Sequence, residues 1–148
     1  MRNSFRSVRF FNEDTNYVLR KKMTVRKWLA IASENENVFP GHVNIIFCSD
    51  DFLYALNRKY LSRDTLTDII AFDFSTEKNE LSGDIYISPE SAKENAIHYG
   101  VPTENEIHRL IIHGFLHLSG YRDNTPASKK AIRDKEDYYL SLLANLLE

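Results

Sequence analysis

The sequence is poor in cysteine, glycine and proline. Its 148 residues include one cysteine, Cys48, together with five glycines and four prolines. A single cysteine cannot form an intrachain disulfide, so a disulfide-stapled fold is excluded and a reducing compartment is compatible with the chain. The sequence also contains no internal repeat, low-complexity tract or Gly/Ser linker. A hydrophobic core must therefore hold the fold together.

Long hydrophobic runs are absent as well. The most apolar segment, residues 110–118, is interrupted by His113 and His117. It is far shorter than the roughly 20 residues that a membrane helix needs. The N-terminal segment also lacks the apolar core of a signal peptide. These absences predict a soluble, cytoplasmic protein without a membrane partner.

The charge is nearly balanced overall but unevenly distributed. The formal net charge is -2, and it does not by itself indicate a nucleic-acid-binding protein. Residues 1–27 carry eight Lys or Arg residues and two acidic residues, a net charge of +6, so the remainder carries -8. The basic segment could contact phosphates, although a solvated basic surface is the plainer interpretation. DNA is not expected as a partner.

What is present is a succession of strand and helix patterns that fits one domain over residues 1–148. The predicted strands are 4–11, 42–49, 67–75 and 81–88, the first of them an edge strand, and the predicted helices are about 24–33, 50–60, 89–99, 103–118 and 127–147. We expect an α+β (mixed α/β) fold, in which a mixed sheet of about four strands is covered by about five helices.

Local signals predict several boundaries. Thr24 is a candidate N-cap for the first helix, and Thr103 with Glu106 forms a candidate capping box for the fourth. The segment FPGH, residues 39–42, predicts a turn before the second strand.

The stretch HGFLHLSGYRDN, residues 113–124, carries the strongest chemical signal. His113 and His117 lie four residues apart, so both face the same side of a helix and can reach one tetrahedral metal ion. Taken alone, the pair is more often two satisfied core or surface histidines. Gly114 between them costs a helix about 1 kcal/mol relative to alanine. It indicates that a strand or a substrate approaches the helix closely at this point.

The rest of the stretch favours a metal site. Gly120 can end the helix and reverse the chain, which would bring Asp123 back as a third ligand. A His₂Asp set with one open position suits a catalytic zinc ion on a zincin-like helix, one ion per chain. Peptidases of that kind have glutamate after the first histidine, and Gly114 stands there instead. The other histidines have no comparable partners and are expected to be structural: His42, His98 and His108.

HGFLHLSGY resembles the signature of the YbeY family of ribosomal-RNA maturation factors. Residues 56–75, LNRKYLSRDTLTDIIAFDFS, and residues 83–88, GDIYIS, are similar to two further family motifs. The resemblance implies a zinc-dependent, single-strand-specific endoribonuclease that acts in 16S rRNA 3′-end maturation and ribosome quality control. Its implied partners are single-stranded RNA, 16S rRNA and proteins of the small ribosomal subunit.

The sequence departs from the family pattern at two positions. The third family histidine is replaced by Asp123, a carboxylate that zinc also accepts. The family arginine implicated in activity is replaced by Leu61, and Arg63, two residues further on, could supply its charge as a catalytic or substrate-binding residue. Arg122 could contact a phosphate or be a solvated loop residue. Asp68 is either a helper acid or base or a turn residue at the start of a strand.

Two other functions remain open at this point. The chain could be a non-catalytic ribosome-assembly module with a structural zinc ion, which the leucine at position 61 favours. It could also be another zinc hydrolase that acts on small molecules or peptides, although Gly114 disfavours peptides.

Overall fold

The structure, a computed structural model, describes residues 7–61 and 67–148. The described elements are β1 (Val8–Asn12), α1 (Lys22–Asn35), β2 (Phe39–Phe47), α2 (Asp50–Leu61), β3 (Ile69–Asp73), β4 (Glu80–Ile87), α3 (Pro89–Tyr99), α4 (Thr103–Leu118) and α5 (Pro126–Leu147). The predicted α+β class, with a four-stranded mixed sheet and five helices, is confirmed. The predicted strand at 4–11 lies partly outside the described residues, and β1 is its described part.

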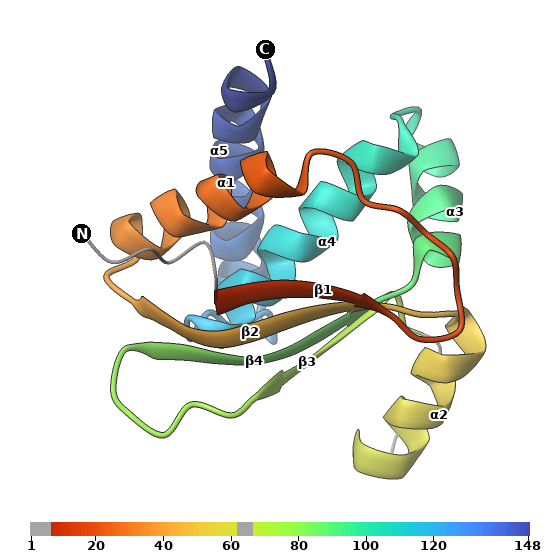
Figure 1. Cartoon of the computed structure of the whole chain (residues 1–148), viewed down its shortest axis with the longest axis horizontal. Helices are drawn as coiled ribbons and strands as arrows, with labels where there is room; N and C mark the ends of the chain where they lie inside the picture. Colours follow the sequence, from red (N-terminus) through yellow and green to blue (C-terminus); the bar gives the residue numbers. More distant parts are fainter. Residues whose placement is uncertain (1–6, 62–66) are drawn as a thin grey trace.

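The sheet has the strand order β1-β2-β4-β3, so β1 and β3 are its edges. β2 runs parallel to both β1 and β4, whereas β3 runs antiparallel to β4. The helices α1, α3, α4 and α5 lie over one face of the sheet, and α2 lies against the other face at one end (Figure 1). The edge strand β3 therefore borders both layers.

The core lies between the sheet and α4. Apolar side chains alternate along β2, where Val43, Ile45 and Phe47 are all buried on the face toward the helices. At Gly114 of α4, an added Cβ would lie 2.6 Å from Cγ2 of Ile85 in β4 and 3.1 Å from Cδ1 of Ile69 in β3. The expected close approach at Gly114 is therefore confirmed, and strands β4 and β3 are the elements that approach α4 there.

The predicted helix caps at Thr24 and Thr103 are wrong. α1 begins at Lys22, because Lys21 adopts a left-handed conformation (φ 55°) and its carbonyl already accepts the backbone N–H of Val25. The residue before α4 is Pro102, which provides no side-chain cap. Glu106 is buried and lies near Arg109, so it does not return to cap the helix.

The predicted turn at residues 39–42 is also wrong, since β2 already begins at Phe39. The pairing of β2 with β4 shifts register between Pro40 and Val43, and this irregularity accommodates the proline within a strand. Within the described ranges, no helix is long and apolar enough to cross a bilayer.

Candidate metal centre

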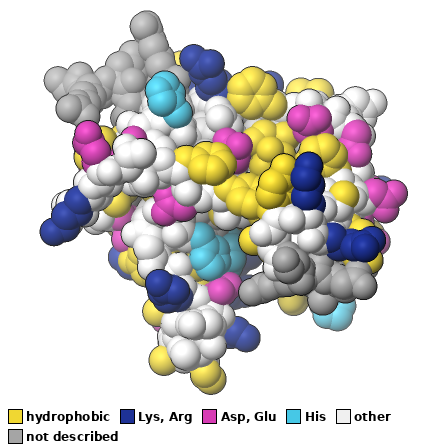
Figure 2. Space-filling model, turned by 90° about the horizontal axis from the view of Figure 1, so that it is seen from below, with side chains coloured by type: hydrophobic (Ala, Val, Ile, Leu, Met, Phe, Trp, Pro, Cys, Tyr) yellow, Lys and Arg dark blue, Asp and Glu magenta, His cyan; other side chains and the backbone are white. Residues whose placement is uncertain are grey.

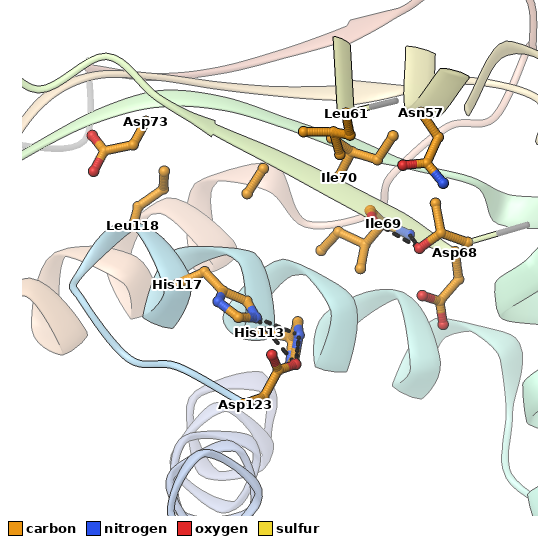
Figure 3. A pocket seen from close by; sticks show the side chains of 12 residues that line it. Asn57, Leu61, Asp68, Ile69, Ile70, Asp73, His113, His117, Leu118 and Asp123 are labelled. Atoms are coloured by element: carbon orange, nitrogen blue, oxygen red, sulfur yellow. Dashed lines mark hydrogen bonds and ion pairs between the residues drawn. The ribbon is translucent and has the colours of Figure 1, made fainter. Parts of the chain in front are cut away.

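Three side chains that the sequence predicted as metal ligands converge at the C-terminal end of α4 (Figure 3). Nε2 of His113 and Nε2 of His117 are 2.9 Å apart. Oδ2 of Asp123 lies 3.6 Å from the first of these nitrogens and 3.4 Å from the second. The predicted convergence of the three residues is therefore observed.

The loop after α4 returns Asp123 to the helix. The backbone N–H of Tyr121 donates to the carbonyl of Leu116, and that of Gly120 donates to the carbonyl of His117. This pair of bonds is a Schellman motif, which places a left-handed residue directly after the helix. Gly120 occupies that position with φ 108°, a conformation that a side chain would strain. The predicted chain reversal is confirmed.

The three residues fit a tetrahedral metal ion. With metal–ligand bonds of about 2.0–2.2 Å, a tetrahedral site separates its ligand atoms by about 3.4 Å. The observed separations of 2.9, 3.4 and 3.6 Å bracket that value. Two imidazoles and one carboxylate are also a donor set that zinc accepts, and three protein ligands leave a position open. These side chains could therefore hold an ion that is still accessible to a substrate.

The protonation state of His117 also suits a metal ligand. Burial lowers the pKa of His117 and the neighbouring His113 lowers it further, whereas Asp123 and a hydrogen bond with the Tyr121 backbone oppose the shift. The ring is therefore held more readily in its neutral form. A histidine must be neutral to bind a metal ion.

Glu136 of α5 orients the first of the two histidines. The Nδ1–H group of His113 donates to Oε2 of Glu136 over 2.5 Å, which leaves Nε2 bare and directed toward His117 and Asp123. Glu136 is itself buried and accepts a hydrogen bond from Arg109 over 2.9 Å. A carboxylate behind a histidine fixes the tautomer of a metal ligand. No role was predicted for this residue from the sequence, although an acidic residue within an apolar helix face was a usable signal.

A second buried carboxylate anchors the loop that carries Asp123. The hydroxyl of Tyr121 donates to Glu36 over 2.7 Å, and Glu36 also accepts a hydrogen bond from Tyr139 and pairs with Lys135 at 3.3 Å. Burial alone would raise the pKa of Glu36, but the hydrogen bonds from Tyr139, Tyr121 and Lys135 outweigh it and lower the pKa. The ionised carboxylate therefore joins α1, α5 and the metal loop.

The cluster opens into a cavity of about 600 Å³ that we call the strand-side cavity. It is bordered by α2, by β3 and by the cluster itself, and its lining residues are Asn57, Leu61, Thr67, Asp68, Ile69, Ile70, Ala71, Asp73, His113, His117, Leu118 and Asp123. Figure 2 shows the hollow with histidine at its floor and hydrophobic side chains along one border. An extended substrate could lie along the open edge of β3 in this cavity.

Asp68 faces the strand-side cavity, but it is held by neighbouring residues. Its carboxylate accepts a hydrogen bond from the side-chain amide of Asn95 over 3.1 Å, and its carbonyl accepts the backbone N–H of Ser88 over 3.2 Å. Both contacts fix the start of β3, as expected of a structural residue.

Within the described residues, the structure does not bring either of the two predicted arginines to the metal cluster. Arg63 lies outside the described residues, so its catalytic role remains a prediction. Leu61, at the family arginine position, is 42% exposed and lines the strand-side cavity. Arg122 is exposed on the metal loop but lines neither that cavity nor the neighbouring one around Arg109. Its contact with substrate also remains a prediction.

Comparisons with known proteins indicate the family of this chain. Residues 9–144 match the family model described as Endoribonuclease YbeY. The chain belongs to the YbeY family. The protein named Endoribonuclease YbeY from Cytophaga hutchinsonii is 43% identical over 136 residues, which cover 92% of this chain and 95% of the relative. Its namesake from Flavobacterium psychrophilum is 42% identical over 132 residues, which cover 89% of this chain and 94% of the relative.

A solved structure extends the YbeY comparison to the fold. The solution structure of TM1509 from Thermotoga maritima superposes with a TM-score of 0.64 at 26% sequence identity. The match covers 92% of this chain and 88% of that protein. The resemblance proposed from three short motifs therefore extends across nearly the whole chain.

Proposed function

We propose that this protein is a metal-dependent endoribonuclease that cuts single-stranded RNA at the cluster of His113, His117 and Asp123. The observation that carries the proposal is the convergence of these three side chains on the floor of an open cavity. The YbeY relatives, which bear the name endoribonuclease, support the choice of RNA as the substrate.

Zinc is the proposed ion, with one ion per chain, because two imidazoles and one carboxylate form a common zinc ligand set. When bound, such an ion supplies Lewis acidity, which polarises a phosphoryl oxygen and acidifies a coordinated water. Glu136 keeps the proton of His113 on Nδ1, and the close packing at Gly114 fixes the height of both histidines above the sheet. The open edge of β3 provides a straight wall along which one unpaired strand could lie.

The proposed biological substrate is the 3′ end of 16S rRNA, which the family resemblance implies. In this setting the protein would act on the small ribosomal subunit, in contact with its proteins, in the cytoplasm, during maturation and quality control. DNA is not a proposed substrate, since the family resemblance implies RNA.

The test compares purified native protein with the His117→Ala variant on the same single-stranded RNA. Native protein should cleave, lose cleavage in EDTA and regain it when zinc is added back. His117→Ala, purified identically, should not cleave although it is folded, because one of three ligands is missing. A DNA strand of the same sequence should stay intact. Equal cleavage by both proteins would show that the cut is made elsewhere, for example by a contaminating nuclease.

A non-catalytic assembly module with a structural metal ion is the second candidate. The observation that favours it is Leu61, an apolar side chain on the cavity where the family places an arginine. This candidate predicts native protein that binds one metal ion per chain but cleaves no RNA.

A further inference from the structure

A second cavity lies next to the strand-side cavity. It measures about 270 Å³ and shares four lining residues with the first: Asp68, Ile69, His113 and Asp123. Its other walls come from the end of α3, from α4 and from the first turns of α5. We call it the helix-side cavity. A substrate strand that passes the metal cluster can therefore continue from one cavity into the other.

The acidic side chains of the helix-side cavity already have partners. Glu136 pairs with Arg109 at 2.9 Å and also accepts from His113. Glu106 lies 3.9 Å from the same Arg109, and Asp68 accepts from Asn95. Asp123, the fourth acidic residue of this cavity, lies 3.6 Å from Nε2 of His113. Arg109 is satisfied too, since its second terminal nitrogen lies 2.8 Å from Asp137. Each acidic side chain of this cavity thus has a polar or charged neighbour, although burial still raises the pKa of Glu106.

Two further cationic side chains lie in the same wall. Lys129 and Arg133 are one turn apart on α5, both are exposed, and both line the helix-side cavity. Across the described part of the chain, neither side chain has a hydrogen bond or an ion pair. Lys130, the next residue along, instead pairs with Asp134 at 2.8 Å and lines none of the cavities described here. The pair therefore places two exposed positive charges beside the metal cluster, of which that of Arg133 also acts on the buried Glu106.

The opposite wall of the helix-side cavity carries an aromatic ring and a side-chain amide, those of Tyr99 and Asn95. Tyr99 at the end of α3 is 60% exposed and lines the cavity, as does Asn95. Exposed aromatic rings stack on nucleic-acid bases, whereas arginine and lysine bind phosphate groups. The volume of the helix-side cavity lies just below the roughly 300–1,000 Å³ of pockets that enclose a drug-sized ligand. A cavity of this size can hold one nucleotide but not a duplex.

We propose that the helix-side cavity is a nucleotide subsite, in which Lys129 and Arg133 bind a phosphate of the RNA strand and Tyr99 stacks on its base. This proposal rests on the proposed function and assigns to it the residues that hold the strand beside the cut. The metal cluster would then lie between two stretches of bound RNA, one along β3 and one beside α5.

The first test measures binding without metal, so that it does not depend on cleavage. A fluorescently labelled single-stranded oligoribonucleotide is titrated with metal-free protein in EDTA, and anisotropy is followed over a series of salt concentrations. Lys129→Ala and Arg133→Ala should each weaken binding by about threefold to tenfold. Each should also reduce the slope of log affinity against log salt by about 0.7, the value for one lost phosphate contact on a single strand.

Matched variants control for the loss of charge and of a ring. Lys130→Ala removes the same charge one residue away and should keep the native affinity and slope. Tyr99→Ala should weaken binding by at least about fivefold without changing the slope. Tyr138→Ala removes another exposed tyrosine, on α5 and outside the cavity, and should bind as the native protein does.

A second measurement separates this proposal from the proposed function. In zinc-loaded protein, Lys129→Ala and Arg133→Ala should raise KM for RNA and leave kcat near the native value. If native protein cleaves RNA while the three cavity variants bind and cleave as it does, the subsite is refuted and the endoribonuclease stands. If native protein cleaves nothing but the cavity variants still bind RNA more weakly than their controls, the subsite stands and the endoribonuclease fails.

Discussion

His108 and His113 lie on the same helix, five residues apart, in opposite surroundings. The side chain of His108 is 5% exposed and packs edge-on to Trp28, and its Nε2 has no hydrogen-bond partner within the described residues. The nearest carboxylate, that of Glu104, is 3.8 Å away. Burial lowers the pKa of His108, although Glu104 opposes the shift. His108 is therefore a buried residue that favours the neutral form, and the sequence predicted it to be structural.

The environment of His113 differs in what surrounds its two nitrogens. Its side chain is 20% exposed, Nδ1 bonds to Glu136, and Nε2 faces His117 and Asp123. The comparison of His108 with His113 shows that a histidine on α4 does not by itself make a metal site. What distinguishes the C-terminal end of the helix is the convergence of further donors, supplied by the next turn, by the loop and by α5.

The largest predicted effect on metal binding comes from removing the carboxylate of Asp123, one of the donors that distinguish the site of His113 from that of His108. Asp123→Ala should weaken zinc binding by more than about 100-fold, since residues that only orient a ligand are already worth about 10–100-fold. Asp123→His should keep the metal, because imidazole is an equally acceptable zinc ligand. Calorimetric titration of the metal-free proteins measures both. Native-like affinity in Asp123→Ala would make Asp123 a bystander.

The next largest effect should come from the carboxylate behind His113. Glu136→Gln should weaken metal binding by about 10–100-fold, because the amide no longer holds the Nδ1 proton as a carboxylate does. Asp137→Asn is the matched control, since Asp137 contacts the same Arg109 but not His113. If the two variants lose affinity equally, the effect arises from Arg109 and not from the orientation of His113.

A smaller effect, on stability, is expected where α4 touches the sheet. Gly114→Ala places a Cβ at 2.6 Å from Ile85, and overpacking of this kind costs about 1–3 kcal/mol of unfolding free energy. Urea unfolding measures the loss. The double variant with Ile85→Ala should lose less than the sum of the two single variants, because the clash is then removed. Strict additivity would show that Gly114 is not held against β4.

The smallest predicted effect is a pH dependence at Glu36. Its folded pKa lies below the ordinary value of 4.5, so its ionised form stabilises the fold above that pH. The contribution is lost as the pH falls through the lowered folded pKa. Native protein should therefore be more stable than Glu36→Gln at pH 7, and urea unfolding should show this difference shrinking below about pH 4.5. A difference that does not change with pH would contradict the proposed role of the charge.

The sequence predicted those parts of the centre that depend on local geometry. The spacing of His113 and His117 and the reversal at Gly120 follow from helix periodicity and from one left-handed residue. Glu136 and Glu36 were missed because their contacts with the centre join residues 23 and 85 positions apart. The periodicity of hydrophobic residues within one helix or strand cannot predict contacts between residues so far apart in the sequence.

The incorrect helix boundaries have a local cause instead. Thr24 and Thr103 have the local chemistry of helix caps, but the chain enters α1 through a left-handed Lys21 and enters α4 through Pro102. Glu106, expected in a capping box, is buried near Arg109 instead. The strand order and the two neighbouring cavities, in contrast, depend on packing between distant segments, so they became visible only in the structure.

The most direct test of the central claim is a zinc titration of metal-free protein prepared without a polyhistidine tag. Native protein and His108→Ala should each bind one ion per chain, whereas His113→Ala and His117→Ala should lose the tight site although they remain folded. Native protein that binds no zinc, or a His117→Ala variant that binds one ion as tightly as the native protein, would contradict the assignment of the metal centre to His113, His117 and Asp123.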